Sequence, residues 1–143
     1  MRVLFLIRCG KEGIGHLTRC KAISQALISY KVDSYFIINS KSGLQYLNNH
    51  QIIDCFDWYN NKKKLEKYLI NYKNIFVDTL SIKYSLLQLI KKKSINFWYI
   101  DDFKRWKHSS GTIIDWTINA KKRKYSSKVN YLFGSKYTCL RKA

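Results

Sequence analysis

Residues 3–30 of the chain read VLFLIRCGKEGIGHLTRCKAISQALISY, and this stretch decides the fold. Its first five residues form a continuous apolar run, which is typical of a parallel strand that is covered on both faces. A glycine-rich turn follows, and apolar side chains then recur at helical spacing: Leu17, Cys20, Ile23, Leu27 and Tyr30. The stretch therefore predicts a strand, a tight turn and a helix, in that order.

The same alternation continues along the rest of the chain. Strands are predicted at residues 34–38, 52–56, 75–77, 96–100, 113–118 and 130–133, and helices at residues 43–49, 62–72 and 82–90. A polar loop is predicted at residues 104–112. Repeated β-α-β units predict a doubly wound, mostly parallel α/β sheet, and the length of 143 residues fits one Rossmann-like domain spanning residues 1–143.

Basic residues dominate the charge, with 27 Lys and Arg against 9 Asp and Glu, a formal net charge of +18. Such an excess raises the prospect of a nucleic-acid or anionic-membrane partner. The excess is mostly Lys, and it accompanies abundant Ile, Asn and Tyr with no Pro, which is typical of an A+T-rich coding sequence. The runs at 62–64, 91–93 and 121–124 lack interleaved aromatics, so we interpret them as solvated faces and expect no specific nucleic-acid partner.

Four cysteines, at positions 9, 20, 55 and 139, form no C-x-x-C pair and no metal-ligand spacing with His. This pattern predicts free thiols in a reducing cytoplasm and no metal site. The apolar run at residues 3–7 is too short for a signal-peptide core, and no stretch approaches the 20 or so apolar residues of a membrane span. We therefore expect a cytoplasmic protein without a transmembrane segment.

The turn Gly13-Ile14-Gly15-His16 has the chemistry of a ligand site, because it lies where the first strand passes into the first helix. Glycines permit positive φ and close backbone approach, and the N–H groups of a helix start attract anions. The helix dipole disfavours imidazolium at that position, so a neutral His16 is expected to act as a general base. Thr18 stands where the dinucleotide fingerprint has its third glycine. The alternative interpretation is a glycine turn whose His caps the helix.

Three acidic residues follow other predicted strands: Asp78, Asp101 and Asp102. They are expected to line the same sheet edge as His16 and to hydrogen-bond a ligand or orient the imidazole, although Asp also caps the segment that follows a strand. Adjacent residues of a strand face opposite ways, so at most one of Asp101 and Asp102 is expected to point into the site. Arg19 either reaches an anionic substrate group or is solvated, and His50 and His108 are interpreted as surface residues.

The motif at residues 13–20, GIGHLTRC, resembles the G-x-G-H-x-x-R opening of GT-B-fold enzymes. Within that fold the chain resembles the UDP-2,4-diacetamido-2,4,6-trideoxy-β-L-altropyranose hydrolases of pseudaminic acid synthesis and their relatives among spore-coat polysaccharide proteins. Further matches are Val77-Asp78, the YIDD at residues 99–102, the DWTIN at residues 115–119 and the GSKYTCLR at residues 134–141, which matches a G-x-x-Y-x-x-L-R motif.

The resemblance implies a metal-free and cofactor-free hydrolysis in which His16 activates a water that attacks the anomeric carbon and releases UDP. It implies that the chain corresponds to the N-terminal, sugar-side half of a GT-B fold, and that a C-terminal domain outside this sequence binds the nucleotide. Whether a separate chain supplies that domain stays open. Substrate-binding residues implied by the motifs and strand ends are Gly13, Gly15, Arg19, Asp78, Asp101, Asp102, Tyr137 and Arg141. Two alternatives stay open: the N-terminal domain of a GT-B glycosyltransferase, and a non-catalytic truncated relic or basic binding module.

Overall fold

The fold is a seven-stranded sheet in which every neighbouring pair of strands is parallel, in the order β3-β2-β1-β4-β5-β6-β7. The computed structural model describes residues 1–10, 13–47, 51–102, 108–120 and 126–138. The predicted doubly wound α/β fold is thus confirmed. The strands are β1 (Arg2–Ile7), β2 (Asp33–Ile38), β3 (Ile52–Cys55), β4 (Asn74–Asp78), β5 (Asn96–Ile100), β6 (Gly111–Asp115) and β7 (Val129–Phe133).

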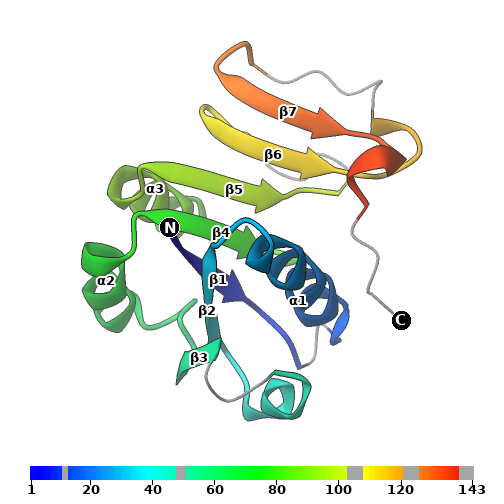
Figure 1. Ribbon diagram of the computed structural model, residues 1–143. Helices are drawn as coiled ribbons and strands as arrows, with labels where there is room; N and C mark the ends of the chain where they lie inside the picture. Colours follow the sequence, from blue (N-terminus) through cyan, green and yellow to red (C-terminus); the bar gives the residue numbers. More distant parts are fainter. Residues whose placement is uncertain (11–12, 48–50, 103–107, 121–125, 139–143) are drawn as a thin grey trace.

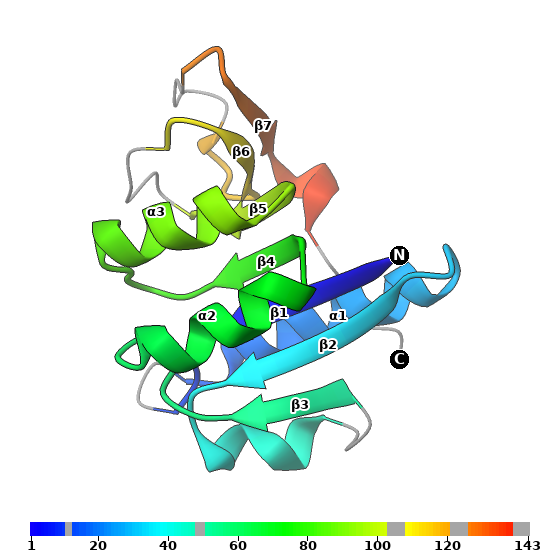
Figure 2. The ribbon, with the colours of Figure 1, turned by 90° about the vertical axis from the view of Figure 1, so that its left-hand side faces the viewer.

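Helices cover the two faces of this sheet. The helices are α1 (Gly15–Ile28), α2 (Lys62–Asn71) and α3 (Tyr84–Lys93), and the 3₁₀ turns include η1 (Lys41–Tyr46) and η4 (Ser135–Tyr137). Figure 2 shows α2 and α3 on one face and α1 on the other. No helix in the described part of the chain is both long and apolar enough to cross a membrane.

Each face carries its own apolar core. On the α1 face, the ring of Phe5 stacks on Phe36 with centroids 4.9 Å apart and lies 5.0 Å from Phe76. These three residues are neighbours in the register of β2, β1 and β4, so one aromatic row crosses the centre of the sheet. On the opposite face, α2 and α3 bury Leu and Ile side chains against β1, β4 and β5. The continuous apolar run of β1 is explained, because it is buried on both faces.

The apolar stripe predicted on the first helix is correct except at its end. Leu17 and Cys20 are buried, and Ile23 and Leu27 pack against the same core. Tyr30 is 77% exposed, because α1 ends at Ile28 and the chain turns before reaching Tyr30. The prediction of Tyr30 as a core residue is therefore wrong.

Two other boundaries also differ from the sequence prediction. The short helix expected at residues 43–49 is a 3₁₀ turn that starts earlier, at Lys41. Strand β6 starts at Gly111, inside the predicted loop, and ends at Asp115, so Ile118 is 91% exposed rather than part of a strand. The cause is Asp115, whose buried carboxylate accepts hydrogen bonds from Thr117 N and Oγ1 at 3.1 and 2.6 Å and turns the chain out of the strand.

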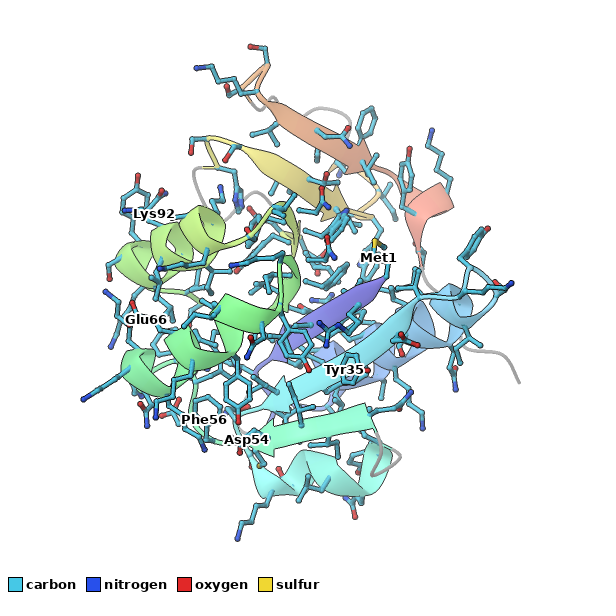
Figure 3. All side chains as sticks on the ribbon, turned by 60° about the vertical axis from the view of Figure 1, so that its left-hand side comes forward. Met1, Tyr35, Asp54, Phe56, Glu66 and Lys92 are labelled. Carbon is cyan, nitrogen blue, oxygen red and sulfur yellow. The ribbon has the colours of Figure 1, made fainter. Side chains whose placement is uncertain are left out.

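Most of the described lysines in the runs predicted to be solvated are exposed. In α2, Lys64 is an exception, since its Nζ lies 2.7 Å from Asp54 Oδ2. Asp54, labelled in Figure 3, also accepts a hydrogen bond from the hydroxyl of Tyr68, which raises the pKa of Tyr68 to about 12. In α3, Lys91 is half-buried with its Nζ 5.3 Å from the centroid of Phe97, and burial lowers its pKa. The run at residues 121–124 and His50 lie outside the described residues.

Candidate functional site

The candidate site lies between β1 and β4, where the strand order reverses. Strands β2 and β3 continue from β1 in one direction, whereas β4 to β7 continue in the other (Figure 1). The loops that leave two such neighbouring strands diverge to opposite faces, which opens a crevice at the carboxyl edge of the sheet. Both the glycine turn after β1 and Asp78 at the end of β4 lie at this edge.

The glycine turn brings His16 over the end of the sheet. Gly13 has φ +84°, a conformation that side chains rarely adopt, and its N–H donates to the carbonyl of Gly10 at 2.8 Å. Helix α1 begins at Gly15, and its N-cap residue Ile14 makes no side-chain capping bond. His16 is therefore in the first helical turn, as predicted, and its side chain is mostly buried.

The His16 side chain contacts the fully buried carboxylate of Asp78, with Nδ1 2.7 Å from Oδ1. A carboxylate accepts hydrogen bonds only, so Nδ1 must carry the hydrogen at this distance. Arg19 Nη2 also lies 3.0 Å from Nδ1 but can only donate, and the shorter contact with the carboxylate decides the tautomer. In the neutral ring the lone pair is then on Nε2. The His16 side chain therefore bonds to Asp78 and does not merely cap the helix.

Arg19 joins two carboxylates to the histidine. Its Nε and Nη2 donate to the two oxygens of Asp78, and its Nη1 donates to Asp102 Oδ2 at 2.8 Å. Its guanidinium carbon also lies 5.0 Å from the ring centroid of Trp116. Burial opposes the charge of Arg19, but the hydrogen bonds and charge of Asp78 outweigh it and raise the pKa of Arg19. Arg19 is thus a largely buried cation paired with two carboxylates and not a solvated side chain, and its contact with an anionic substrate group stays a prediction.

The same contacts set the charge of Asp78. Burial alone raises the pKa of a carboxyl group, yet the hydrogen bonds from Arg19 and His16 outweigh burial and lower the pKa of Asp78 below its ordinary value. Cys20 adds a weak thiol donor, with Sγ 3.5 Å from Asp78 Oδ2. With His16 neutral, the two carboxylates and one guanidinium leave a net charge of −1 in the cluster.

Asp101 and Asp102, the two acidic residues that follow β5, point in different directions, as the alternation of side chains along a strand predicts. Asp102 turns to Arg19, and its buried Oδ1 has no hydrogen-bond partner in the part of the chain that the structure describes. Asp101 turns to the other face, where its Oδ2 lies 3.0 Å from His108 Nε2. His108 is only 6% exposed and its ring centroid lies 5.1 Å from that of Tyr99. The prediction of His108 as a surface residue is wrong, because the buried carboxylate of Asp101 needs a donor.

The structure thus brings together His16, Arg19, Asp78 and Asp102 beside the glycine turn, and it turns Asp101 away. Tyr137 lies in η4 beyond β7, three strands away from β4 in the sheet order. Arg141 lies outside the described residues. Sequence reasoning missed Cys20 and Trp116 as neighbours of the cluster; the helical spacing of Cys20 from His16 was the available signal for the first.

Among the described residues, no group of three or more His, Cys, Asp or Glu side chains is arranged to hold a metal ion. Comparisons of the chain with protein-family models, with curated proteins and with solved structures found no match. Any assignment of function therefore depends on the geometry of the site and on the motif resemblance described above.

Proposed function

We propose that this chain provides the sugar side of a nucleotide-sugar hydrolase, with His16 as the general base. The observation that carries the proposal is the contact between His16 Nδ1 and Asp78 Oδ1 at 2.7 Å, at the point where the strand order reverses. A histidine oriented by a buried carboxylate is one arrangement that general-base catalysis uses. The resemblance of the GIGHLTRC motif to UDP-sugar hydrolases supports the same reaction class.

In the proposed reaction, Nε2 of His16 accepts a proton from a water molecule. The oxygen of that water forms a bond to the anomeric carbon of the sugar, and the bond between this carbon and the phosphate oxygen breaks. UDP leaves with the bonding electrons, and the free sugar keeps the oxygen of the water. Asp78 holds the imidazole through Nδ1 and stabilises the imidazolium that forms. Arg19 keeps Asp78 ionised and oriented.

The sugar is proposed to bind beside this pair. Asp102 is the carboxylate proposed to contact the sugar, since its Oδ1 has no hydrogen-bond partner among the described residues. The backbone at Gly15 is accessible, because a Cβ atom added there would meet no atom within 4 Å. In the resembling family a second domain binds the nucleotide, and we propose that UDP is bound by such a domain, whether on this polypeptide or on a separate chain. The free thiol of Cys55 agrees with a proposed cytoplasmic location.

The test measures hydrolysis of a UDP-linked diacetamido sugar in ¹⁸O-labelled water by this chain together with its nucleotide-binding domain. The expected products are UDP without label and free sugar with one ¹⁸O atom at the anomeric carbon. His16→Ala is expected to lower kcat by roughly 10²–10⁴-fold, the usual contribution of a general base. Thr18→Ala is the matched control, because the Thr18 hydroxyl bonds only to the carbonyl of Gly15 at 3.1 Å.

Other outcomes decide between the alternatives. Label in UDP would mean attack at phosphorus, and an unchanged rate in His16→Ala would remove the histidine from the mechanism. Glycosyl transfer predicts a coupled product when an acceptor is added and little free sugar. A basic binding module predicts binding of duplex DNA with a steep salt dependence and no binding of the sugar nucleotide.

A further inference from the structure

The edge of the sheet at which the strands begin, here called the amino edge, carries exposed apolar side chains. A helix that connects two parallel strands runs back along the sheet, so the last turns of α1, α2 and α3 lie at this edge. In Figure 2 the arrowheads of β2, β3 and β4 point to the left, so the amino edge is on the right. Four large apolar residues lie in or just after these last turns and are strongly exposed: Ile28 (65%), Tyr30 (77%), Ile70 (63%) and Ile95 (77%).

Hydrogen bonds between neighbouring strand starts join these positions into one continuous surface. The backbone N–H of Ile95 donates to the carbonyl of Lys73 at 2.7 Å, which places Ile95 beside the segment that follows α2. The side-chain amide of Asn74 donates to the carbonyl of Arg2 at 2.9 Å, which joins the starts of β4 and β1. Strand β2 is the other neighbour of β1 and begins directly after the end of α1. The amino edge therefore runs unbroken from the end of α1 to the start of β5.

Basic side chains accompany the apolar ones along the amino edge. Five are exposed there: Arg2, Lys31, Lys92, Lys93 and Lys128. In the described part of the chain, Asp33 is the one acidic residue at this edge. Most of the other described acidic residues lie at the carboxyl ends of the strands or just beyond them: Asp54, Asp57, Asp78, Asp101, Asp102 and Asp115. The amino edge is therefore basic and partly apolar, and the carboxylates gather at the opposite edge.

This combination fits the surface of an anionic lipid bilayer. Lysines attract acidic headgroups, and aliphatic side chains gain free energy when they leave water for the boundary between headgroups and acyl chains. A duplex nucleic acid would also attract the lysines, but its phosphate backbone offers no apolar phase for exposed isoleucines. Exposed apolar residues at the carboxyl edge, such as Leu80, lie near the candidate site, whereas no described site accounts for those at the amino edge.

We propose that the amino edge docks this protein on an anionic membrane surface, with its four exposed apolar side chains at the level of the lipid headgroups. The central strands have five or six residues, so the carboxyl edge lies about 17 Å from the amino edge. The crevice that contains His16 is then held in water, away from the bilayer. Docking therefore does not depend on the reaction proposed for that crevice.

The proposal is tested by co-sedimentation of the 143-residue chain with two kinds of vesicle, at physiological ionic strength. One kind contains phosphatidylcholine alone, and the other is an equimolar mixture with phosphatidylglycerol. The chain is expected to bind the mixed vesicles and to bind phosphatidylcholine far more weakly. Ile95→Ser is expected to weaken binding roughly tenfold, because an apolar side chain no longer leaves water. The double variant Lys92→Gln/Lys93→Gln is expected to weaken binding by roughly tenfold or more, since each lysine near an anionic surface contributes about fivefold.

Two matched controls remove the same groups elsewhere on the surface. Ile118→Ser replaces an isoleucine that is 91% exposed beyond the carboxyl end of β6. Lys62→Gln/Lys63→Gln replaces two exposed lysines at the start of α2, the end of that helix remote from the amino edge. A helix of this length spans about 15 Å, which exceeds the Debye length of about 8 Å at physiological ionic strength. Both controls are expected to bind as the wild type does.

The proposal is overturned if the wild type does not bind the mixed vesicles. It is also overturned if either control weakens binding as much as its counterpart, because binding would then reflect the overall charge or apolarity of the chain. A parallel titration with duplex DNA separates the two anionic partners. DNA binding that is lost in Lys92→Gln/Lys93→Gln, with vesicle binding unaffected by Ile95→Ser, would assign the amino edge to nucleic acid and contradict the proposal.

Discussion

Replacement of Arg19 by Met tests the electrostatic core of the site. Arg19 contributes two hydrogen bonds to Asp78 and one, of 2.8 Å, to Asp102. Asp78 is fully buried, so Arg19→Met leaves its charge with only His16 and Cys20 as side-chain partners among those described above. Removal of one partner from a buried ion pair costs about 3–5 kcal/mol, and we expect Arg19→Met to lower the free energy of unfolding by that amount.

The assay is equilibrium urea denaturation at neutral pH, with a double-mutant cycle. Asp78→Asn in the Arg19→Met background removes the uncompensated charge and is expected to restore most of the lost stability. Arg2→Met is the control, because Arg2 is exposed and its guanidinium carbon lies 5.5 Å from the ring centroid of Tyr72. A cation over an exposed ring contributes about 0.5–1 kcal/mol, so the control should lose no more than this.

The stability lost in Arg19→Met is expected to depend on pH in one direction. The pKa of Asp78 is lowered in the folded protein, so its contribution to stability is fully present above the ordinary Asp pKa and is lost as the pH falls through the lowered value. The difference in stability between wild type and Arg19→Met is therefore largest at neutral pH and shrinks in acid. A loss below about 1 kcal/mol at neutral pH, or a difference that persists in acid, would refute the reasoning.

Further predictions concern the glycine turn, Ser24 and Tyr68. Gly13→Ala is expected to destabilise the chain by about 1 kcal/mol, because Gly13 has a positive φ, and thermal melts measure this loss. Gly15→Ala is expected to fold normally. Under the proposed function it raises KM, because the added methyl group blocks approach of the substrate to the backbone, and steady-state kinetics measure this. Ser24→Ala is expected to leave the free energy of unfolding unchanged or to raise it by about 1 kcal/mol, as urea denaturation would show. Tyr68→Phe is expected to reduce the loss of stability at high pH, because the hydrogen bond to Asp54 raises the Tyr68 pKa to about 12 and its stabilisation disappears as the pH rises through that value; melting temperatures across this range measure it.

The sequence alone predicted the fold class and the sheet edge that His16 and Asp78 share. The apolar run of β1 and the helical stripe from Leu17 to Leu27 define a β-α unit, and its repetition defines a parallel sheet. Because parallel strands end at one edge, His16 and Asp78 were predicted to share that edge, and the structure brings them into contact. The alternation of side chains along a strand likewise predicted the separation of Asp101 from Asp102.

What the sequence did not reveal depends on contacts between distant segments. Strand order follows from tertiary packing, so nothing in the local pattern placed β1 beside β4 and made their junction the point of reversal. The pairing of His108 with Asp101 is a tertiary contact, and a lone His in a polar stretch carries no signal of burial.

The most direct test of the His16–Asp78 pair is the tautomer of the His16 ring, read from long-range ¹⁵N–¹H correlations at a pH where the imidazole is neutral. The 2.7 Å contact predicts a hydrogen on Nδ1 and a lone pair on Nε2, the state in which Nε2 can accept a proton from water. A spectrum in which Nε2 carries the hydrogen would contradict the account, because His16 would then have no base directed to the substrate.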